Sequence, residues 1–249
     1  METLIVMAKA PRAGSAKTRL QPAVSATDAA TLAAAFLNDT LELAGRWQRQ
    51  QVAADPNRRV VLYGDAGPDD GQLQQAADRC GARLVPQVGA TLGERMANAV
   101  TQELERGARA AVVIGTDAPH IPPHLLDEAF RALAWERVVL GPAFDGGYWL
   151  VGTARPSADL FAGVAWSTPE VFAQTVALLG RQAITPHLLP YWYDVDTAED
   201  LARLRIHLAL LRRRDAHIAP RTAKWLESHG ADAAARGPAS PTVTPLPEP

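Results

Sequence analysis

The sequence predicts an α/β fold, a three-layer α/β/α sandwich with a mostly parallel sheet. Short apolar runs with the length of buried parallel strands occupy residues 4–7, 60–63, 110–114 and 138–140. Helical patterns alternate with these runs, as a parallel sheet covered by helices requires. The chain of 249 residues is also long enough to bury a substantial core in one domain.

Three helices are predicted between the strands. Residues 27–47 are rich in Ala and Leu, with apolar residues at helical spacing, and residues 70–80 form a shorter candidate. Residues 92–106 form the third candidate, which ends at Gly107, a residue type that favours helix ends.

Later in the chain, capping residues predict further helix starts. Pro122 and its neighbour Pro123 suit the first turn of a helix, and Thr168 with Pro169 suits an N-cap and the first helical position. Residues 197–200 have the spacing of a capping box, with Asp in place of the usual Glu or Gln, ahead of a long helical pattern.

Composition limits the class of protein. We expect one catalytic domain over residues 1–229 and a disordered tail over residues 230–249, where Pro, Ala and small polar residues offer little surface to bury. The net charge of -2 gives no basic field for a nucleic acid polymer.

Residues 4–7 are too short to span a membrane, and the single Cys80 forms no internal disulfide, so we expect a cytoplasmic protein.

The loop after the first strand is unusually basic. It places four cationic side chains around one glycine: Lys9, Arg12, Lys17 and Arg19 around Gly14. Such a loop at a strand's carboxyl end suits a nucleotide's phosphates, because its backbone amides and its charges can both bind phosphate oxygens. The alternative is a solvated surface loop. Neither the P-loop pattern nor the dinucleotide-binding glycine pattern is present.

Two acidic segments follow apolar runs. Asp117 comes shortly after residues 110–114, where a carboxylate is placed to bind Mg²⁺ or Mn²⁺ together with substrate phosphates. Asp194 and Asp196 point the same way if their segment is extended, so one of them can complete the metal site while the other orients it. The alternative for Asp117 is a role in a turn or a helix cap.

A Gly-rich segment offers an acceptor site. Asp145, Gly146 and Gly147 predict a hairpin turn, and the same residues let a ligand approach the backbone. Asp145 is the candidate acid or base for an acceptor hydroxyl, and Tyr148 or Trp149 is a candidate to lie against a sugar. The two interpretations are compatible.

Taken together, six segments resemble the GT-A superfamily of nucleotide-diphospho-sugar transferases. The closest resemblance, over roughly residues 3 to 210, is to the DUF2064 family of glycosyltransferases linked to arsenosugar biosynthesis. The segments that carry it are MAKAPRAGSAKTRL, LGERM, GTDAP, GPAFDGGYWLVG, WST and DVDTAEDL. The chain is also similar, more distantly, to 2-phospholactate guanylyltransferases and other small nucleotidyltransferases.

The resemblance implies roles for particular residues. The first loop would hold nucleotide phosphates, with Lys17 also among the catalytic residues, and the metal would bind Asp117 and Asp196. Trp166 and Ser167 would border the acceptor pocket.

A further position carried over from the resemblance is Arg95 in the LGERM segment. This residue would contact the donor or the acceptor, with a surface ion pair as the alternative.

Three functions remain open. The first is metal-dependent glycosyl transfer from a nucleotide sugar to a small-molecule acceptor. The second is nucleotidyl transfer, in which a phosphorylated acceptor reacts with a nucleoside triphosphate and pyrophosphate leaves. The third is a nucleotide-binding protein without turnover.

Overall fold

The computed structural model of the chain describes residues 1–21, 23–50, 58–65, 71–155 and 160–229. Strands and helices alternate along this part of the chain, as predicted. The predicted tail over residues 230–249 lies outside the described residues, as does Asp70 at the start of the second predicted helix.

Within the described residues, seven strands form one sheet in the order β3-β2-β1-β4-β6-β5-β7. Their bounds are β1 Glu2–Ala8, β2 Arg58–Gly64, β3 Arg83–Pro86, β4 Ala110–Ile114, β5 Val138–Pro142, β6 Tyr148–Thr153 and β7 His187–Leu188. β6 runs antiparallel to its neighbours β4 and β5, and the other pairs are parallel. The predicted, mostly parallel sheet is therefore confirmed.

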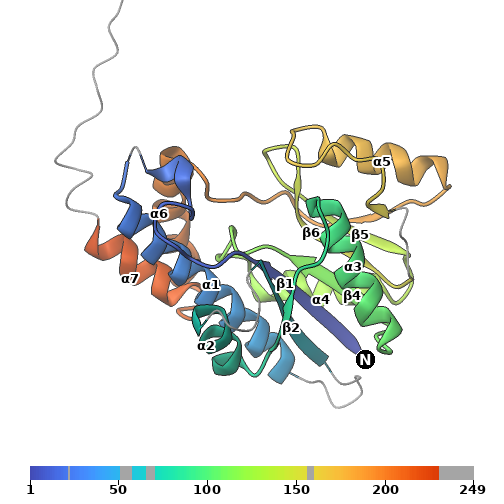
Figure 1. Cartoon of the computed structure of the whole chain (residues 1–249), viewed down its shortest axis with the longest axis horizontal. Coiled ribbons are helices and arrows are strands. Elements are labelled where there is room, and N and C mark those ends of the chain that lie inside the picture. The colour runs from blue at the N-terminus through green and yellow to red at the C-terminus, as the bar shows by residue number, and fades with distance from the viewer. Residues whose placement is uncertain (22, 51–57, 66–70, 156–159, 230–249) are drawn as a thin grey trace, which may run out of the picture.

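Helices cover both faces of the sheet and complete three layers (Figure 1). The described α-helices are α1 Ala26–Arg49, α2 Gly71–Cys80, α3 Leu92–Glu105, α4 Pro123–Ala132, α5 Val171–Arg181, α6 Ala198–Arg212 and α7 Pro220–Ser228. None of them combines the length and the apolar character needed to cross a membrane. Successive side chains of β1 point to opposite faces of the sheet. Leu4 packs in the apolar cluster with α1, α2 and α4. Ile5 packs in the cluster with α3 and α5 on the other face.

A third apolar cluster joins α1 to α6 and α7. Among its fully buried residues are Leu20, at the end of the short 3-10 helix η1 (Thr18–Leu20), and Val195. Leu20 closes the first loop, and Val195 lies between Asp194 and Asp196. Burial of both residues therefore draws the basic loop and the second acidic segment together.

Most predicted helix starts are confirmed, and one is wrong. Pro123 begins α4, and residues 197–200 form a capping box at the start of α6. The predicted N-cap at Thr168 is not found, because α5 begins at Val171. Thr168 Oγ1 instead donates a hydrogen bond of 2.7 Å to the carbonyl oxygen of Ala165, so a local turn uses the hydroxyl.

Candidate active site

Lys17 joins the two acidic segments at the carboxyl edge of the sheet. Its ammonium Nζ lies 2.6 Å from Asp117 Oδ1 and 2.9 Å from Asp196 Oδ1, and it donates a hydrogen bond of 2.7 Å to the carbonyl oxygen of Val195. An ammonium group has three N–H donors, and these contacts use all three. The structure thus brings together the first loop, Asp117 and Asp196, which lie far apart in the sequence.

Backbone contacts hold the second acidic segment beside the strand ends. The Val195 amide donates a hydrogen bond of 2.9 Å to the Asp117 carbonyl. The Trp192 amide donates one of 3.0 Å to Pro142, and the Phe144 amide donates one of 3.1 Å back to Trp192. These bonds continue the pairing of β5 beyond its end, so the carboxylates stand on fixed backbone.

Asp194 lies close enough to the other three carboxylates of this edge for their charges to act on its pKa. Burial raises the pKa of Asp194 from its ordinary value of 3.8 to about 8. The charges of Asp117, Asp145 and Asp196 act in the same direction on this pKa, and that of Lys17 opposes them. Asp194 therefore carries a proton at neutral pH unless another cation is present.

Lys17 itself remains charged. Burial alone lowers the pKa of this side chain, which is 6% exposed, but Asp117 and Asp196 outweigh burial and raise its pKa above the ordinary 10.5. Its backbone is left-handed, with φ of +48°, which is uncommon for a residue other than glycine. Lys17 is a predicted phosphate ligand and catalytic residue, and here it directs its donors to protein oxygens.

Asp145 lies in the hairpin turn between β5 and β6, and this turn confirms the predicted hairpin. Its Oδ1 accepts a hydrogen bond of 2.9 Å from the Gly147 amide. Gly146 has φ of +87°, and a Cβ atom there would lie 2.0 Å from the carbonyl oxygen of Pro169, so only glycine fits. The turn is fixed against the loop before α5, and Asp145 lies close enough for its charge to act on Asp194.

The other basic residues of the first loop are exposed at this edge. Lys9 and Arg12 are exposed, and Arg19 Nη1 lies 3.9 Å from Asp196 Oδ2. Gly14 has φ of +83° and open space at its Cβ position, so a ligand can approach the backbone there. Phosphate binding by these residues stays a prediction.

Arg95 lies on the first turn of α3, which begins at Leu92 as predicted. Its Nε donates a hydrogen bond of 3.0 Å to the carbonyl oxygen of Gly89, and Glu94 accepts one of 2.7 Å from the Ala90 amide. Both side chains therefore shape the loop after β3. Contact of Arg95 with a donor or an acceptor stays a prediction.

The predicted acceptor residues divide between surface and interior. Ser167 is exposed, with left-handed φ of +66°. The rings of Tyr148 and Trp166 are half-buried and meet edge-to-face at 6.0 Å, and a Cβ atom on Gly93 would lie 2.0 Å from the Trp166 Nε1. Burial raises the pKa of the Tyr148 hydroxyl above its ordinary value. Trp149 is buried, so the expected contact of Trp149 with a sugar is wrong.

Sequence reasoning missed His120, which is completely buried three residues after Asp117. Its ring centroid lies 4.5 Å from that of Tyr193 and 5.2 Å from that of Trp192. Burial lowers the pKa of His120 to about 3, with His207 acting in the same direction, so the imidazole is neutral. The ring packs one acidic segment against the other, and no local sequence signal marks such a role.

The donor set at this edge fits a divalent cation. Asp117 and Asp196 are partly exposed, and each already directs one oxygen at the same cationic atom. Mg²⁺ often binds one or two carboxylates together with substrate phosphates. In the part of the chain that the structure describes, no group of three or more His, Cys, Asp or Glu forms a metal site by itself. Nucleotide phosphates would therefore supply the remaining ligands.

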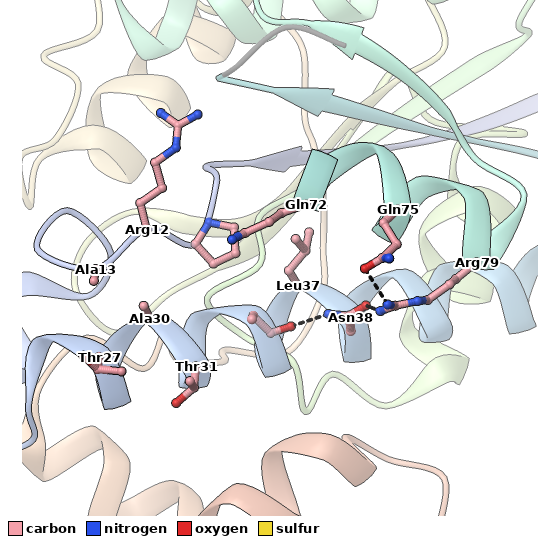
Figure 2. A pocket seen from close by; sticks show the side chains of 12 residues that line it. Arg12, Ala13, Thr27, Ala30, Thr31, Leu37, Asn38, Gln72, Gln75 and Arg79 are labelled. Carbon is pink, nitrogen blue, oxygen red and sulfur yellow. Dashed lines mark hydrogen bonds between the residues drawn. The ribbon is translucent and has the colours of Figure 1, made fainter. Parts of the chain in front are cut away.

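A groove of about 580 Å³ lies beside the first loop, over α1 and α2 (Figure 2). Along it, Arg79 donates hydrogen bonds of 2.9 Å to Asn38 Oδ1 and 2.7 Å to Gln75 Oε1. None of the four carboxylates of the candidate site lines this groove, but Arg12 of the first loop does. The lining residues are Pro11, Arg12, Ala13, Thr27, Ala30, Thr31, Ala34, Leu37, Asn38, Gln72, Gln75 and Arg79.

Comparison with protein families is consistent with this architecture. The model of a family described as "Uncharacterized protein conserved in bacteria (DUF2064)" matches residues 43–168, about half of the chain. The chain belongs to the DUF2064 family. The match includes Asp117 and Asp145 but neither the first loop nor Asp196. Comparison of this DUF2064 protein with functionally curated proteins gave no match.

Solved structures share the fold of this DUF2064 protein. A protein from Desulfovibrio desulfuricans G20, classed as a nucleotide-diphospho-sugar transferase, is 29% identical with a TM-score of 0.78, over 92% of this chain and 95% of that one. A cytidylyltransferase from Leptospira borgpetersenii serovar Hardjo-bovis (strain JB197) is 12% identical with a TM-score of 0.50, over 88% of this chain and 96% of that one. Glucosyl-3-phosphoglycerate synthase from Mycobacterium tuberculosis is 12% identical with a TM-score of 0.50, over 89% of this chain and 79% of that one. The predicted GT-A fold is therefore confirmed.

Proposed function

We propose that this DUF2064 protein is a metal-dependent transferase that uses a nucleotide-activated donor, and that the donor is a nucleotide sugar. The main support is the meeting of Asp117, Asp196 and Lys17 beside a basic loop at the carboxyl edge of the sheet. Ligands of open α/β sheets bind at this edge. The relative from Desulfovibrio desulfuricans G20, classed as a nucleotide-diphospho-sugar transferase, supports the choice of a sugar donor.

In this proposal the acceptor hydroxyl forms a bond to the anomeric carbon of the sugar, while the bond from that carbon to the diphosphate breaks. Asp145 accepts the hydroxyl proton, and the nucleoside diphosphate leaves with the bonding electrons. A bound Mg²⁺ or Mn²⁺ would supply positive charge that stabilises the leaving diphosphate. Asp117 and Asp196 would hold this cation, and the exposed basic residues of the first loop bind the phosphates.

Lys17 acts as a positioning residue in this scheme. Its three donors hold Asp117, Val195 and Asp196 in one place, so the carboxylates are gathered before a ligand arrives. Gathering like charges in advance lowers the cost of forming the site on binding.

Nucleotidyl transfer is the second candidate, favoured by the density of basic residues in the first loop. Here an oxygen of a phosphorylated acceptor forms a bond to the α-phosphorus of a nucleoside triphosphate, and pyrophosphate leaves toward the loop. Both reactions use this fold, so the fold does not choose between them. A nucleotide-binding protein without turnover is the third candidate, and the retained carboxylates Asp117 and Asp196 argue against it.

Thermal unfolding with Mg²⁺ or Mn²⁺ and a panel of nucleotide sugars and nucleoside triphosphates tests the proposal. A ligand at 100 times its Kd should stabilise the folded protein by about 2.7 kcal/mol. We expect stabilisation by a nucleotide sugar with metal and its loss in Asp117→Asn. Asp127→Asn is the matched control, because Asp127 pairs with Arg58 at the opposite edge of the sheet and should leave this stabilisation unchanged.

The outcomes separate the candidates. Stabilisation by triphosphates alone would favour nucleotidyl transfer. Stabilisation by a nucleotide sugar with no transfer to any offered acceptor, including water, would favour the protein without turnover. No stabilisation by any nucleotide would refute all three, and full stabilisation of Asp117→Asn would remove that residue from the metal site.

A further inference from the structure

Two exposed aromatic rings lie together at the carboxyl edge, outside the proposed nucleotide site. Phe144 is 71% exposed and Tyr191 is 53% exposed. Their ring centroids are 5.5 Å apart, with the planes inclined by 26°, and Phe172 contacts Tyr191 edge-on at 6.3 Å. Single exposed apolar residues are common, whereas contiguous exposed patches mark binding surfaces. We call Phe144 and Tyr191 the aromatic platform.

The backbone beneath the aromatic platform is fixed from both sides. The Phe144 amide donates to the Trp192 carbonyl at 3.1 Å, which ties the hairpin turn to the segment that carries Tyr191. The Phe172 amide donates to the Gly146 carbonyl at 2.8 Å, which ties the same turn to α5. A surface that is rigid before binding loses little conformational entropy when a ligand arrives.

The aromatic platform lies next to the carboxylates of the candidate site. Asp145 follows Phe144 directly in the sequence. Trp192, which is hydrogen-bonded to Phe144, is two residues before Asp194, about 7 Å along an extended segment. The backbone of the platform is therefore continuous with the backbone that carries Asp145 and Asp194.

We propose that the aromatic platform binds the acceptor, and that the acceptor carries a six-membered ring with an apolar face and a hydroxyl group. This inference rests on the proposed transferase function. Aromatic side chains recognise such faces by stacking, while nearby polar groups orient the ligand. A sugar and a hydroxylated aromatic ring share this chemistry. Asp145 then meets the hydroxyl while Phe144 and Tyr191 carry the ring.

Saturation-transfer NMR titrations with three probes test the proposal. The probes are methyl β-D-glucopyranoside, hydroquinone and glycerol. At least one of the two ring probes should bind, and glycerol, which has no ring, should not. Phe144→Ala and Tyr191→Ala should each weaken ring binding by about fivefold to tenfold. Phe144→Tyr and Tyr191→Phe keep the rings and should bind like the original protein.

Trp135→Ala is the matched control for loss of an exposed aromatic side chain. Trp135 is 89% exposed and lies between α4 and β5, at the opposite edge of the sheet. Its removal should leave ring binding unchanged. Binding of only one ring probe would support the platform and identify its acceptor as a sugar or as an aromatic compound.

Three results would overturn the platform: no binding of either ring probe, equal binding by the alanine variants, or a dimer that becomes monomeric in Phe144→Ala. The last result would show that a second copy of the chain covers the rings. Light scattering after size-exclusion chromatography measures it. Stabilisation by nucleotide sugar and Mg²⁺ is measured on the same samples. Ring binding without any nucleotide stabilisation would refute the proposed donor and leave the ring site standing.

Discussion

The two edges of the sheet both gather charged side chains, but they balance charge differently. At the amino edge, buried Glu2 lies 2.6 Å from Arg109 Nη2 and 3.6 Å from Arg58 Nε. Asp127 lies 2.9 Å from Arg58 Nη2, so two carboxylates face two guanidinium groups. At the carboxyl edge, the buried ammonium group of Lys17 contacts both Asp117 and Asp196, while the basic side chains around it, such as Arg19 at 3.9 Å from Asp196, are exposed.

This difference in charge pairing indicates different roles for the two edges of the sheet. A cluster in which opposite charges are paired needs nothing further to remain in a folded protein. At the carboxyl edge, burial raises the pKa of Asp194, and the charges of Asp117, Asp145 and Asp196 act in the same direction, so this carboxyl group holds a proton. A bound cation would act in the opposite direction. We therefore propose that the carboxyl edge binds the ligand and that the charges of the amino edge stabilise the fold.

The largest effect is expected from Arg58→Met at the amino edge. Glu2 and Asp127 both lose a partner, so the free energy of unfolding should fall by about 3 to 5 kcal/mol, as measured by urea titration. Arg109→Met is the control, because more than half of that side chain is exposed and its loss should cost below about 1 kcal/mol. Equal losses for the two variants would contradict the distinction between a buried and an exposed partner.

Lys17→Met should have a smaller effect at the carboxyl edge. Without a metal, Asp117 and Asp196 lose their shared cation, so the free energy of unfolding should fall by about 2 kcal/mol. Added Mg²⁺ should raise the thermal midpoint of the variant less than that of the original protein, because the two carboxylates are no longer gathered before the cation binds. A larger Mg²⁺ effect in the variant would show instead that the cation takes the place of the ammonium group and that Lys17 does not position the carboxylates.

Asp194→Asn should change how stability depends on pH. When a chelator keeps metal ions away, the pKa of Asp194 is about 8 in the folded protein, whereas its ordinary value of 3.8 applies in the unfolded chain. This residue's contribution is therefore present below pH 4 and is lost as pH rises toward 8. Asn cannot ionise, so the variant should be more stable at pH 8 by about 2 kcal/mol in urea titrations. Exposed Glu199→Gln should leave the pH profile unchanged, and an unchanged profile for Asp194→Asn would contradict the assignment.

Features set by near neighbours were predictable from the sequence. The apolar run at residues 4–7 became β1, and residues 197–200 formed the expected cap, because each depends only on adjacent residues. The helix start at Thr168 was wrong because a neighbouring carbonyl competes for the hydroxyl. β3 was missed because it lies at the sheet edge, where Arg83 and Pro86 are exposed and break the apolar run.

The position of the candidate site could be predicted from the order of residues along the chain. Basic residues follow β1 and Asp117 follows β4, and the carboxyl ends of parallel strands share one edge. The folded chain was needed to show that Lys17 lies between the acidic segments, that burial keeps the proton on Asp194, and that the rings of Phe144 and Tyr191 are exposed side by side. These properties depend on burial and on contacts between distant residues, which no local pattern contains.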